Sequence, residues 1–215
     1  MRVILALVAL AALGGHLFAQ TAPSAADLAG RIQSRQTTIR DFTADFTQTT
    51  TSQFLTRSPE ERGQVKVKKP GRIRQSYTTA DRNEFVADGT LFYSFFRKDG
   101  FVTKAPLPPA EDGSLWSFLL GRGNLVRDFQ PHMPPGQPPG EWHLILTSRT
   151  PQAQFPSLTL RVDRKSLQLR GLVVVDQQGT TSTYRFDNLR ENVGLSDREF
   201  DFKVPAGVLV QDAGR

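Results

Sequence analysis

Side chains that could carry out catalysis are few in this sequence and far apart. Of its three histidines, His16 lies in the N-terminal segment, His132 in a proline-rich stretch and His143 alone among apolar residues. Two scattered histidines without a carboxylate cluster cannot supply the ligand set of a zinc site. The pair Glu60-Glu61 stands in a polar turn and is expected to solvate that turn. We therefore predict no catalytic residue, no metal site and no cofactor.

Known catalytic and nucleotide-binding motifs are also missing. The sequence contains neither a Gly-x-Ser-x-Gly elbow nor a Gly-x-x-x-x-Gly-Lys-Ser/Thr loop. An envelope enzyme that acts on lipids would need a nucleophile paired with a base, and no such pair stands out. The function is expected to be binding and not catalysis.

The N-terminus has the form of an export signal. Arg2 is followed by eleven apolar residues, Val3 to Leu13, and then by small residues that end at Ala19. This pattern is typical of a secretory signal peptide, and the apolar run is shorter than the roughly 20 residues that span a bilayer. We expect residues 1–19 to be removed, although cleavage after Ala22 remains open, and the mature chain to be exported.

The charge balance and the cysteine content limit which partners and which covalent modifications are expected. The chain has 27 basic and 21 acidic side chains, a net charge of +6 that becomes +5 without Arg2. Such a balance suits nucleic acid, an anionic membrane or an acidic protein, and export makes nucleic acid the least favoured partner. No cysteine is present, so neither a disulfide framework nor N-terminal lipidation of a cysteine is expected.

The first half of the mature chain predicts one helix and then a meander of strands. Ser24-Ala25-Ala26-Asp27 has the form of a capping box, so a helix is expected over residues 24–38. From Phe42 the apolar period changes to two, and this period continues on both sides of the Pro70-Gly71 break. Turns at Asp88-Gly89 and Asp99-Gly100 then divide three short strands, which are expected to pair as antiparallel hairpins.

The middle of the chain interrupts this pattern twice. Residues 112–120 crowd five large apolar side chains before a Gly121-Arg122-Gly123 stop, which predicts a short helix. Residues 131–140 hold five prolines and two glycines, and we expect a stiff loop there, with a semi-rigid linker as the alternative.

Further strands are expected at residues 142–147, 158–163, 167–176, 180–186 and 199–204. About eleven strands with two or three helices predict a mainly β fold, a strongly curved antiparallel sheet with helices on one side, which makes a concavity. About 195 residues remain after processing, enough for one domain over residues 20–215.

Four segments in a fixed order resemble the family of periplasmic outer-membrane lipoprotein carriers, the LolA family. They are Phe42-Thr43-Ala44-Asp45-Phe46-Thr47-Gln48, Lys68-Lys69-Pro70-Gly71-Arg72-Ile73-Arg74, Val86-Ala87-Asp88-Gly89 and the stretch from Phe200 to Val208. The resemblance implies an unclosed β-barrel under an α-helical lid. It also implies a monomeric, non-enzymatic carrier that receives lipoproteins from an inner-membrane ABC transporter and passes them to an outer-membrane acceptor.

The resemblance also implies the parts of the binding site. The acyl-chain cavity is expected to be lined by Phe42, Phe46, Val65, Val67, Ile73, Tyr77 and Phe92. The lid is expected to present Leu115, Trp116, Phe118, Leu119 and Leu120. In the family an arginine before the motif proline latches the lid; Lys69 stands there here, and Arg72 or Arg74 is the alternative latch.

Simpler interpretations stand beside these. The aromatic residues could be ordinary core, the 112–120 helix could be a core helix, and the basic residues around Pro70 could be a solvated strand face or a docking site for a partner. A lipid- or lipoprotein-sensing module, or a carrier of another amphiphile such as a glycolipid, is the alternative function. The period of two also leaves open which face of each strand is buried.

Overall fold

A computed structural model describes residues 22–79, 81–107, 118–149 and 155–213. Within these residues one sheet of 12 strands follows the order β12-β6-β5-β4-β3-β2-β1-β11-β10-β9-β8-β7. The strands of the first half are β1 (Asp41–Thr51), β2 (Glu60–Lys68), β3 (Arg72–Tyr77), β4 (Glu84–Asp88), β5 (Leu91–Phe96) and β6 (Phe101–Pro106). Those of the second half are β7 (Phe129–His132), β8 (Glu141–Ser148), β9 (Ser157–Asp163), β10 (Leu169–Val175), β11 (Thr181–Glu191) and β12 (Leu209–Asp212).

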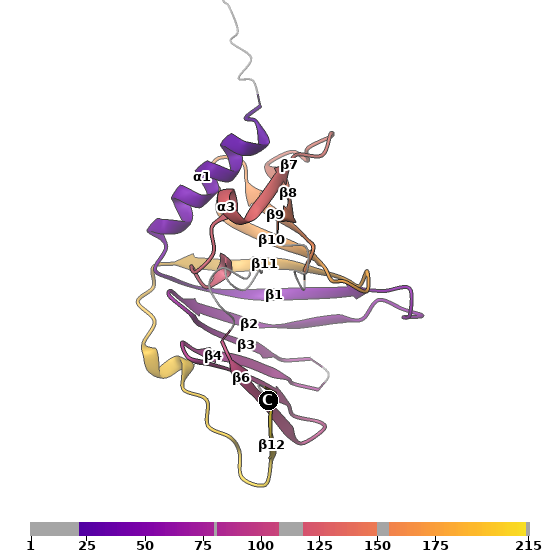
Figure 1. The fold of residues 1–215 in the computed structure, drawn as a ribbon, viewed down its shortest axis with the longest axis vertical. Helices are drawn as coiled ribbons and strands as arrows, with labels where there is room; N and C mark the ends of the chain where they lie inside the picture. Colours follow the sequence, from indigo (N-terminus) through magenta and orange to yellow (C-terminus); the bar gives the residue numbers. More distant parts are fainter. Residues whose placement is uncertain (1–21, 80, 108–117, 150–154, 214–215) are drawn as a thin grey trace, which may run out of the picture.

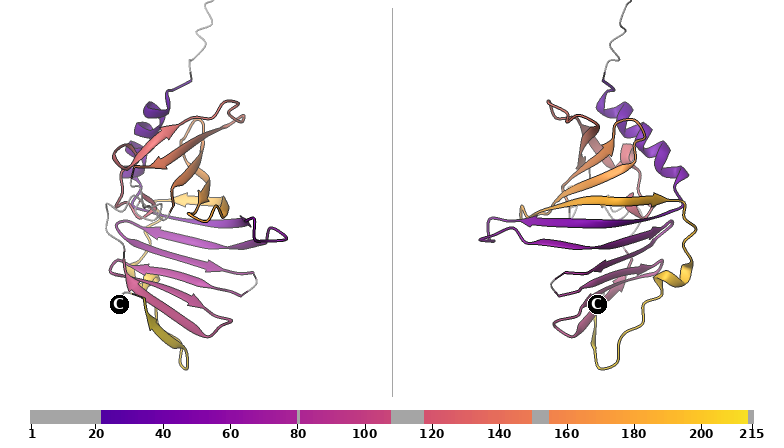
Figure 2. Two further views of the ribbon diagram at one scale, coloured as in Figure 1. Left: turned by 45° about the vertical axis from the view of Figure 1, so that its right-hand side comes forward. Right: turned by 180° about the vertical axis from the view of Figure 1, so that it is seen from behind.

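The sheet is curved and unclosed, as the sequence predicts. Its two edges are β7 and β12, and the two halves of the chain meet in the middle, where β1 pairs with β11. The concave face of the curved sheet is called its inner side here, and α1 lies near the β7 edge (Figures 1 and 2). All strand pairs are antiparallel except β12 with β6, which is parallel.

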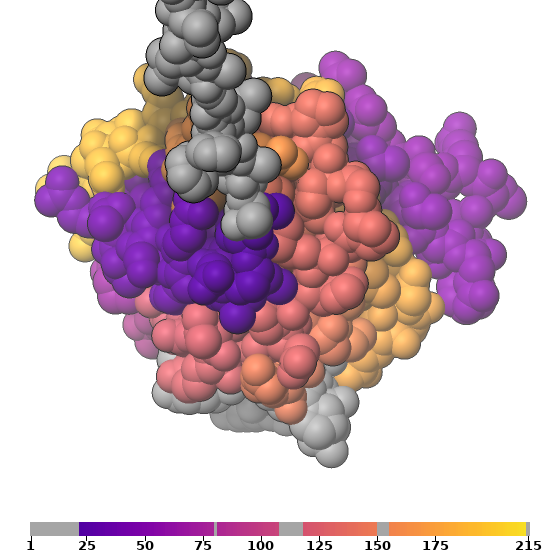
Figure 3. All heavy atoms as spheres, turned by 90° about the horizontal axis from the view of Figure 1, so that it is seen from above, coloured from indigo at the N-terminus to yellow at the C-terminus, as the bar shows by residue number. Residues whose placement is uncertain are grey.

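The helix predicted over residues 24–38 is confirmed as α1 (Ala25–Thr38), and the side-chain oxygen of Ser24 accepts a hydrogen bond from the backbone N–H of Asp27. Leu28, Ala29 and Ile32 form its buried face. Seen from above, α1 lies against the part of the chain that carries α3 (Leu125–Asp128) and β7 (Figure 3). Among the described residues no helix is long and apolar enough to cross a membrane.

Two expectations about local structure are wrong. Part of the predicted loop 131–140 is strand, because Pro131 and His132 pair with β8 as the end of β7. Proline is tolerated there since β7 is an edge strand and needs no N–H on its free side. The rest of the stretch connects β7 to β8, and the side chain of Gln137 bonds it to the backbone of His143.

The predicted strand 199–204 is the second error. Asp197–Phe200 forms the short 3-10 helix η1, started by a capping box between Ser196 and Glu199. The local capping signal therefore outweighs the alternation of Phe200 with Phe202. The final strand lies later, at β12.

The segment from residue 192 to residue 208, here called the C-terminal strap, runs from β11 to β12 along the outer side of the sheet (Figures 1 and 2). Its η1 packs on β3 and β4. Phe200 is fully buried there, and the ring of Phe202 lies 5.0 Å from Tyr93 and 6.2 Å from Phe95. The outer face thus has a small apolar core of its own.

Candidate functional site

The structure determines which face of the central strands is enclosed. In β1 the buried residues alternate, so Phe42, Ala44, Phe46 and Gln48 share the inner face. Ile73 and Gln75 of β3 share the same face, whereas Arg72 and Arg74 lie on the outer face. The inner face of the central strands therefore forms one continuous wall.

A cavity of about 80 Å³ lies against this wall. It is lined by Phe42, Phe46, Val65, Val67, Ile73, Gln75, Leu119, Phe155, Leu172, Val174, Ser182, Tyr184 and Phe186. Most of these side chains are apolar, and they come from β1, β2, β3, β10 and β11 together with two connecting segments. Such a lining is suited to hydrocarbon.

Five of the seven residues predicted for the cavity line it: Phe42, Phe46, Val65, Val67 and Ile73. Tyr77 lies beside the lining, with its ring edge-to-face on Phe46 at 5.0 Å. Phe92 of β5 packs against the main core but is not one of the lining residues. Most of the lining residues that sequence reasoning missed lie on β10 and β11, where the alternation was visible but the pairing of β11 with β1 was not. The others are Gln75 on β3 and Phe155 in a connecting segment.

The predicted lid falls only partly within the described residues. Leu115 and Trp116 lie outside them, whereas Phe118 and Leu119 are helical and Leu120 starts the turn that follows. All three are buried, and Leu119 lines the cavity. The carbonyl oxygen of Leu120 accepts a hydrogen bond of 3.0 Å from the N–H of Gly71. The end of this helix is thereby joined to the loop that starts β3.

Lys69 lies in the same loop and contacts both α1 and the end of the predicted lid. Its ammonium group donates hydrogen bonds to Gln36 in the last turn of α1, where free carbonyl groups favour a cation. Its aliphatic stem packs on Gly121, where an added Cβ would lie 2.6 Å from Lys69 Cδ. Burial lowers the pKa of Lys69 to about 8.

The expectation that Arg72 or Arg74 latches the lid does not fit their positions. Both side chains extend from the outer face of β3. Arg74 donates to the carbonyl oxygens of Glu199 and Asp201 and pairs with Glu84, and Arg72 lies 3.5 Å from Asp197. Strand alternation directs them away from the cavity.

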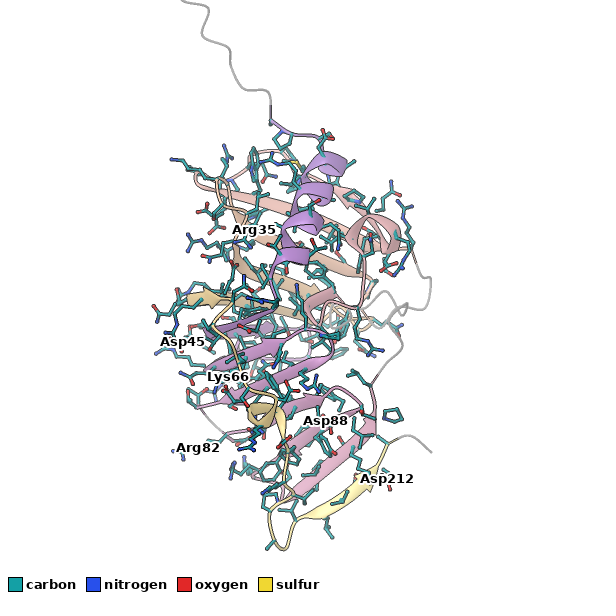
Figure 4. The ribbon with its side chains drawn as sticks, turned by 90° about the vertical axis from the view of Figure 1, so that its left-hand side faces the viewer. Arg35, Asp45, Lys66, Arg82, Asp88 and Asp212 are labelled. Carbon is teal, nitrogen blue, oxygen red and sulfur yellow. The ribbon has the colours of Figure 1, made fainter. Side chains whose placement is uncertain are left out.

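The basic cluster around Pro70 is largely paired within the molecule. Lys66 binds Glu199 at 2.6 Å, and Lys68 binds both Asp197 and the carbonyl oxygen of Leu195. Figure 4 labels Lys66 beside the strap that carries these partners. The cluster therefore holds the C-terminal strap and is not simply a solvated strand face.

The described residues contain no group of three or more His, Cys, Asp or Glu side chains that could hold a metal ion. His143 lies 3.2 Å from Glu141, which also pairs with Arg161. The outward positions of these side chains on β8 and β9 separate them from the cavity.

Known proteins resemble this chain in sequence and in fold. An outer-membrane lipoprotein carrier protein of Serratia proteamaculans (strain 568) is 30% identical over 189 residues, which cover 87% of this chain and 89% of the relative. Its counterpart in Vibrio parahaemolyticus serotype O3:K6 (strain RIMD 2210633) is 29% identical over 195 residues, 89% of each chain.

Among solved structures, an uncharacterized conserved protein of Thermus thermophilus superposes with a TM-score of 0.53 at 12% identity, over 86% of this chain and 98% of that one. This likeness concerns the fold alone. Residues 37–203 match the family described as outer membrane lipoprotein carrier protein LolA. With its unclosed sheet and apolar cavity, the chain belongs to the LolA family.

Proposed function

We propose that this protein is a periplasmic carrier that binds the acyl chains of lipoproteins and shields them from water. The observation that carries the proposal is the apolar cavity on the inner face of the central strands, lined by Phe42, Phe46 and Ile73 among others. Each methylene group removed from water contributes about 0.8 kcal/mol, so a lipid anchor crosses an aqueous compartment only inside such a shelter.

The two relatives named above are both called outer-membrane lipoprotein carrier proteins, which supports the same role for this chain. A carrier binds and releases its cargo without converting it chemically, so a member of this family is a binding protein and not an enzyme. The mature chain, residues 20–215 as a single domain, takes its cargo as a monomer from an inner-membrane ABC transporter and gives it to an outer-membrane acceptor.

The size of the cavity supports a carrier that opens when it loads. A volume of about 80 Å³ is far below the roughly 300–1,000 Å³ of ordinary ligand pockets. Leu119 and Phe155 line the cavity from connecting segments and not from the sheet. These two side chains can move without breaking strand pairing, so we propose that they form a gate that opens the cavity to cargo. We propose that Lys69 and the Gly71–Leu120 hydrogen bond form the latch that keeps this gate closed.

The first test is native mass spectrometry of the tagged protein purified from the periplasm, followed by identification of what co-purifies. Triacylated lipoprotein bound one to one is the expected result. If a free glycolipid co-purifies instead, the protein is a carrier, but its cargo is not a lipoprotein. A protein that is empty and also refuses added lipoprotein would favour a sensing module instead.

The second test places a charge at the gate. Leu119→Asp is expected to weaken lipoprotein retention at least about tenfold, because a carboxylate in the cavity is costly to desolvate. Val126→Asp is the matched control, since Val126 is 51% exposed on α3. Urea unfolding of both variants separates a binding defect from a folding defect; loss of folding in Leu119→Asp alone would make Leu119 a core residue and remove it from the gate.

A further inference from the structure

One end of the cavity carries polar side chains. Gln48 of β1 and Gln75 of β3 are 8% and 5% exposed, and both point inward. Tyr184 of β11 lines the cavity at the same level, because it is the direct partner of Gln48 across the β1–β11 pairing, and Ser182 lines it two positions further along, opposite Thr50. Together with Tyr77, these residues are called the polar cluster below.

Three members of the polar cluster, Gln48, Tyr77 and Gln75, are joined by hydrogen bonds. The Tyr77 hydroxyl donates to Gln48 Oε1, and Gln75 Nε2 donates to the Tyr77 hydroxyl at 2.9 Å. The Tyr184 hydroxyl lies close enough to the side chains of Tyr77 and Gln75 to interact with them electrostatically. Burial raises the pKa of Tyr77, so this hydroxyl keeps its proton for donation.

The sequence makes room for this arrangement at Gly63. Gly63 lies on β2 between Phe46 and Tyr77, its partners on β1 and β3. A Cβ added there would lie 2.7 Å from the ring of Phe46. The Phe46 ring therefore lies over Gly63, and Tyr77 packs on its edge.

A carboxylate lies at the outer limit of the polar cluster. Glu61 is two positions before Gly63 on β2, so it shares the inner face, and it is the direct partner of Gln48. It is only partly exposed, and its charge acts on both Tyr77 and Tyr184. This position differs from the simple solvation of a turn expected for Glu60-Glu61, and it adds an acceptor to the hydroxyl and amide donors nearby.

The polar cluster also gives the cavity a direction. Phe42, Val67 and Ile73 lie toward the end of the strands where Leu120 bonds to Gly71. Gln48 and Tyr77 lie further along β1 and β3, toward the end that carries the β1–β2 hairpin (Figure 1). One end of the wall is thus apolar and the other offers hydrogen bonds. In ligand pockets a few fixed polar groups of this kind orient a mostly apolar ligand.

We propose that the polar cluster is a binding subsite for the ester and amide groups at the junction between the acyl chains and the peptide of a lipidated cysteine. The acyl chains then extend toward Leu119, and the peptide leaves at the hairpin end. Ester carbonyl groups accept from Tyr184 and Gln75, and the amide N–H donates to Gln48 or Glu61. This inference rests on the proposed carrier function and adds the orientation of the cargo.

The test compares ligands that differ only at the junction. The probes are a dipalmitoyl-glyceryl-cysteinyl peptide, its ether analogue without the two ester carbonyl groups, and the apolar dye 1-N-phenylnaphthylamine. Wild type is expected to bind the ester peptide about tenfold more tightly than the ether peptide. Tyr184→Phe and Gln75→Met are each expected to reduce this preference to about twofold or less, with dye binding unchanged.

Thr183→Val is the matched control, since Thr183 is on the same strand as Tyr184 but on its other face. It should keep the full preference. Two variants are used so that a folding defect in one, seen by thermal melting, leaves the other informative. If wild type shows no preference, or if both variants keep it, the polar cluster is structural and the subsite is refuted. Dye binding by wild type without binding of either peptide would overturn the carrier proposal itself and the subsite with it.

Discussion

The Nζ atom of Lys69 donates a hydrogen bond of 2.6 Å to the backbone carbonyl oxygen of Gln36 and another of 3.0 Å to its side-chain Oε1. Two residues further on, Gly71 donates its N–H to Leu120. The loop between β2 and β3 therefore joins the end of α1 to the end of the predicted lid. The Lys69 ammonium group at this junction is partly buried, so the stability of the folded protein is expected to depend on pH.

Lys69 is expected to make stability rise with pH between about 8 and 10.5. Burial lowers its pKa from 10.5 to about 8 in the folded state. In that window the unfolded chain binds more protons than the folded one, so the free energy of unfolding increases with pH. In urea unfolding, the free energy of unfolding of wild type should therefore increase relative to that of Lys69→Met as the pH rises through this range. Below about pH 8 the difference between the two proteins should stay constant. Lys203→Met, at an exposed lysine, is the control; a difference that is the same at every pH would contradict the burial of Lys69.

Phe200 is expected to anchor the C-terminal strap. Its side chain is fully buried on the outer face of β3 and β4, and Phe→Ala changes in cores cost roughly 3–5 kcal/mol. Phe200→Ala should lower stability and expose Arg198 and Lys203 to trypsin in the folded protein. Phe54→Ala, at a side chain that is 75% exposed, should change stability by less than about 0.5 kcal/mol. If the strap of Phe200→Ala stays resistant to trypsin, its ion pairs are sufficient to hold it on the sheet without the Phe200 side chain.

The ion pair between Lys66 and Glu199 allows the contribution of charge to the stability of the C-terminal strap to be measured. The two charged groups lie 2.6 Å apart and are each about one third exposed, so the pair is worth at most about 1 kcal/mol. Glu199→Lys should cost more than Glu199→Gln, because Lys66 and Arg74 both lie beside it. Adding Lys66→Glu should recover part of the loss. A double-mutant cycle with no coupling would show that the pair does not hold the strap.

Two glycines are expected to respond in opposite directions to alanine. Gly30 lies within α1 with nothing within 4 Å of an added Cβ, so Gly30→Ala should raise the free energy of unfolding by up to about 1 kcal/mol. Gly63→Ala should lower it, since the new methyl group meets the Phe46 ring at 2.7 Å and the carbonyl oxygen of Ser76. Thermal melts of the two variants test both predictions. A neutral Gly63→Ala would mean that the Phe46 ring and the β3 backbone at Ser76 can both move away from β2.

Local elements and the overall class of this fold could be predicted from sequence because their signals are local. The Ser24 cap, the period of two around Val65 and Ile73, and the turn at Asp88-Gly89 each lie within a few residues of the structure that they specify. The same reasoning failed at Phe200, where a local capping box competed with an alternating pattern and formed a 3-10 helix instead. It also found half of the cavity wall, the half that lies on β1, β2 and β3.

The sequence by itself determined a sheet with one helix before it, an apolar set of side chains on β1 to β3, and the family to which the chain belongs. The tertiary structure alone decided which face of each strand is enclosed and that β11 closes the wall beside β1. It also directed Lys66, Lys68, Arg72 and Arg74 to the strap and brought Gln75 and Tyr77 to Tyr184. Each of these depends on pairing between strands far apart in the chain, and a period of two carries no information about which distant strand comes alongside.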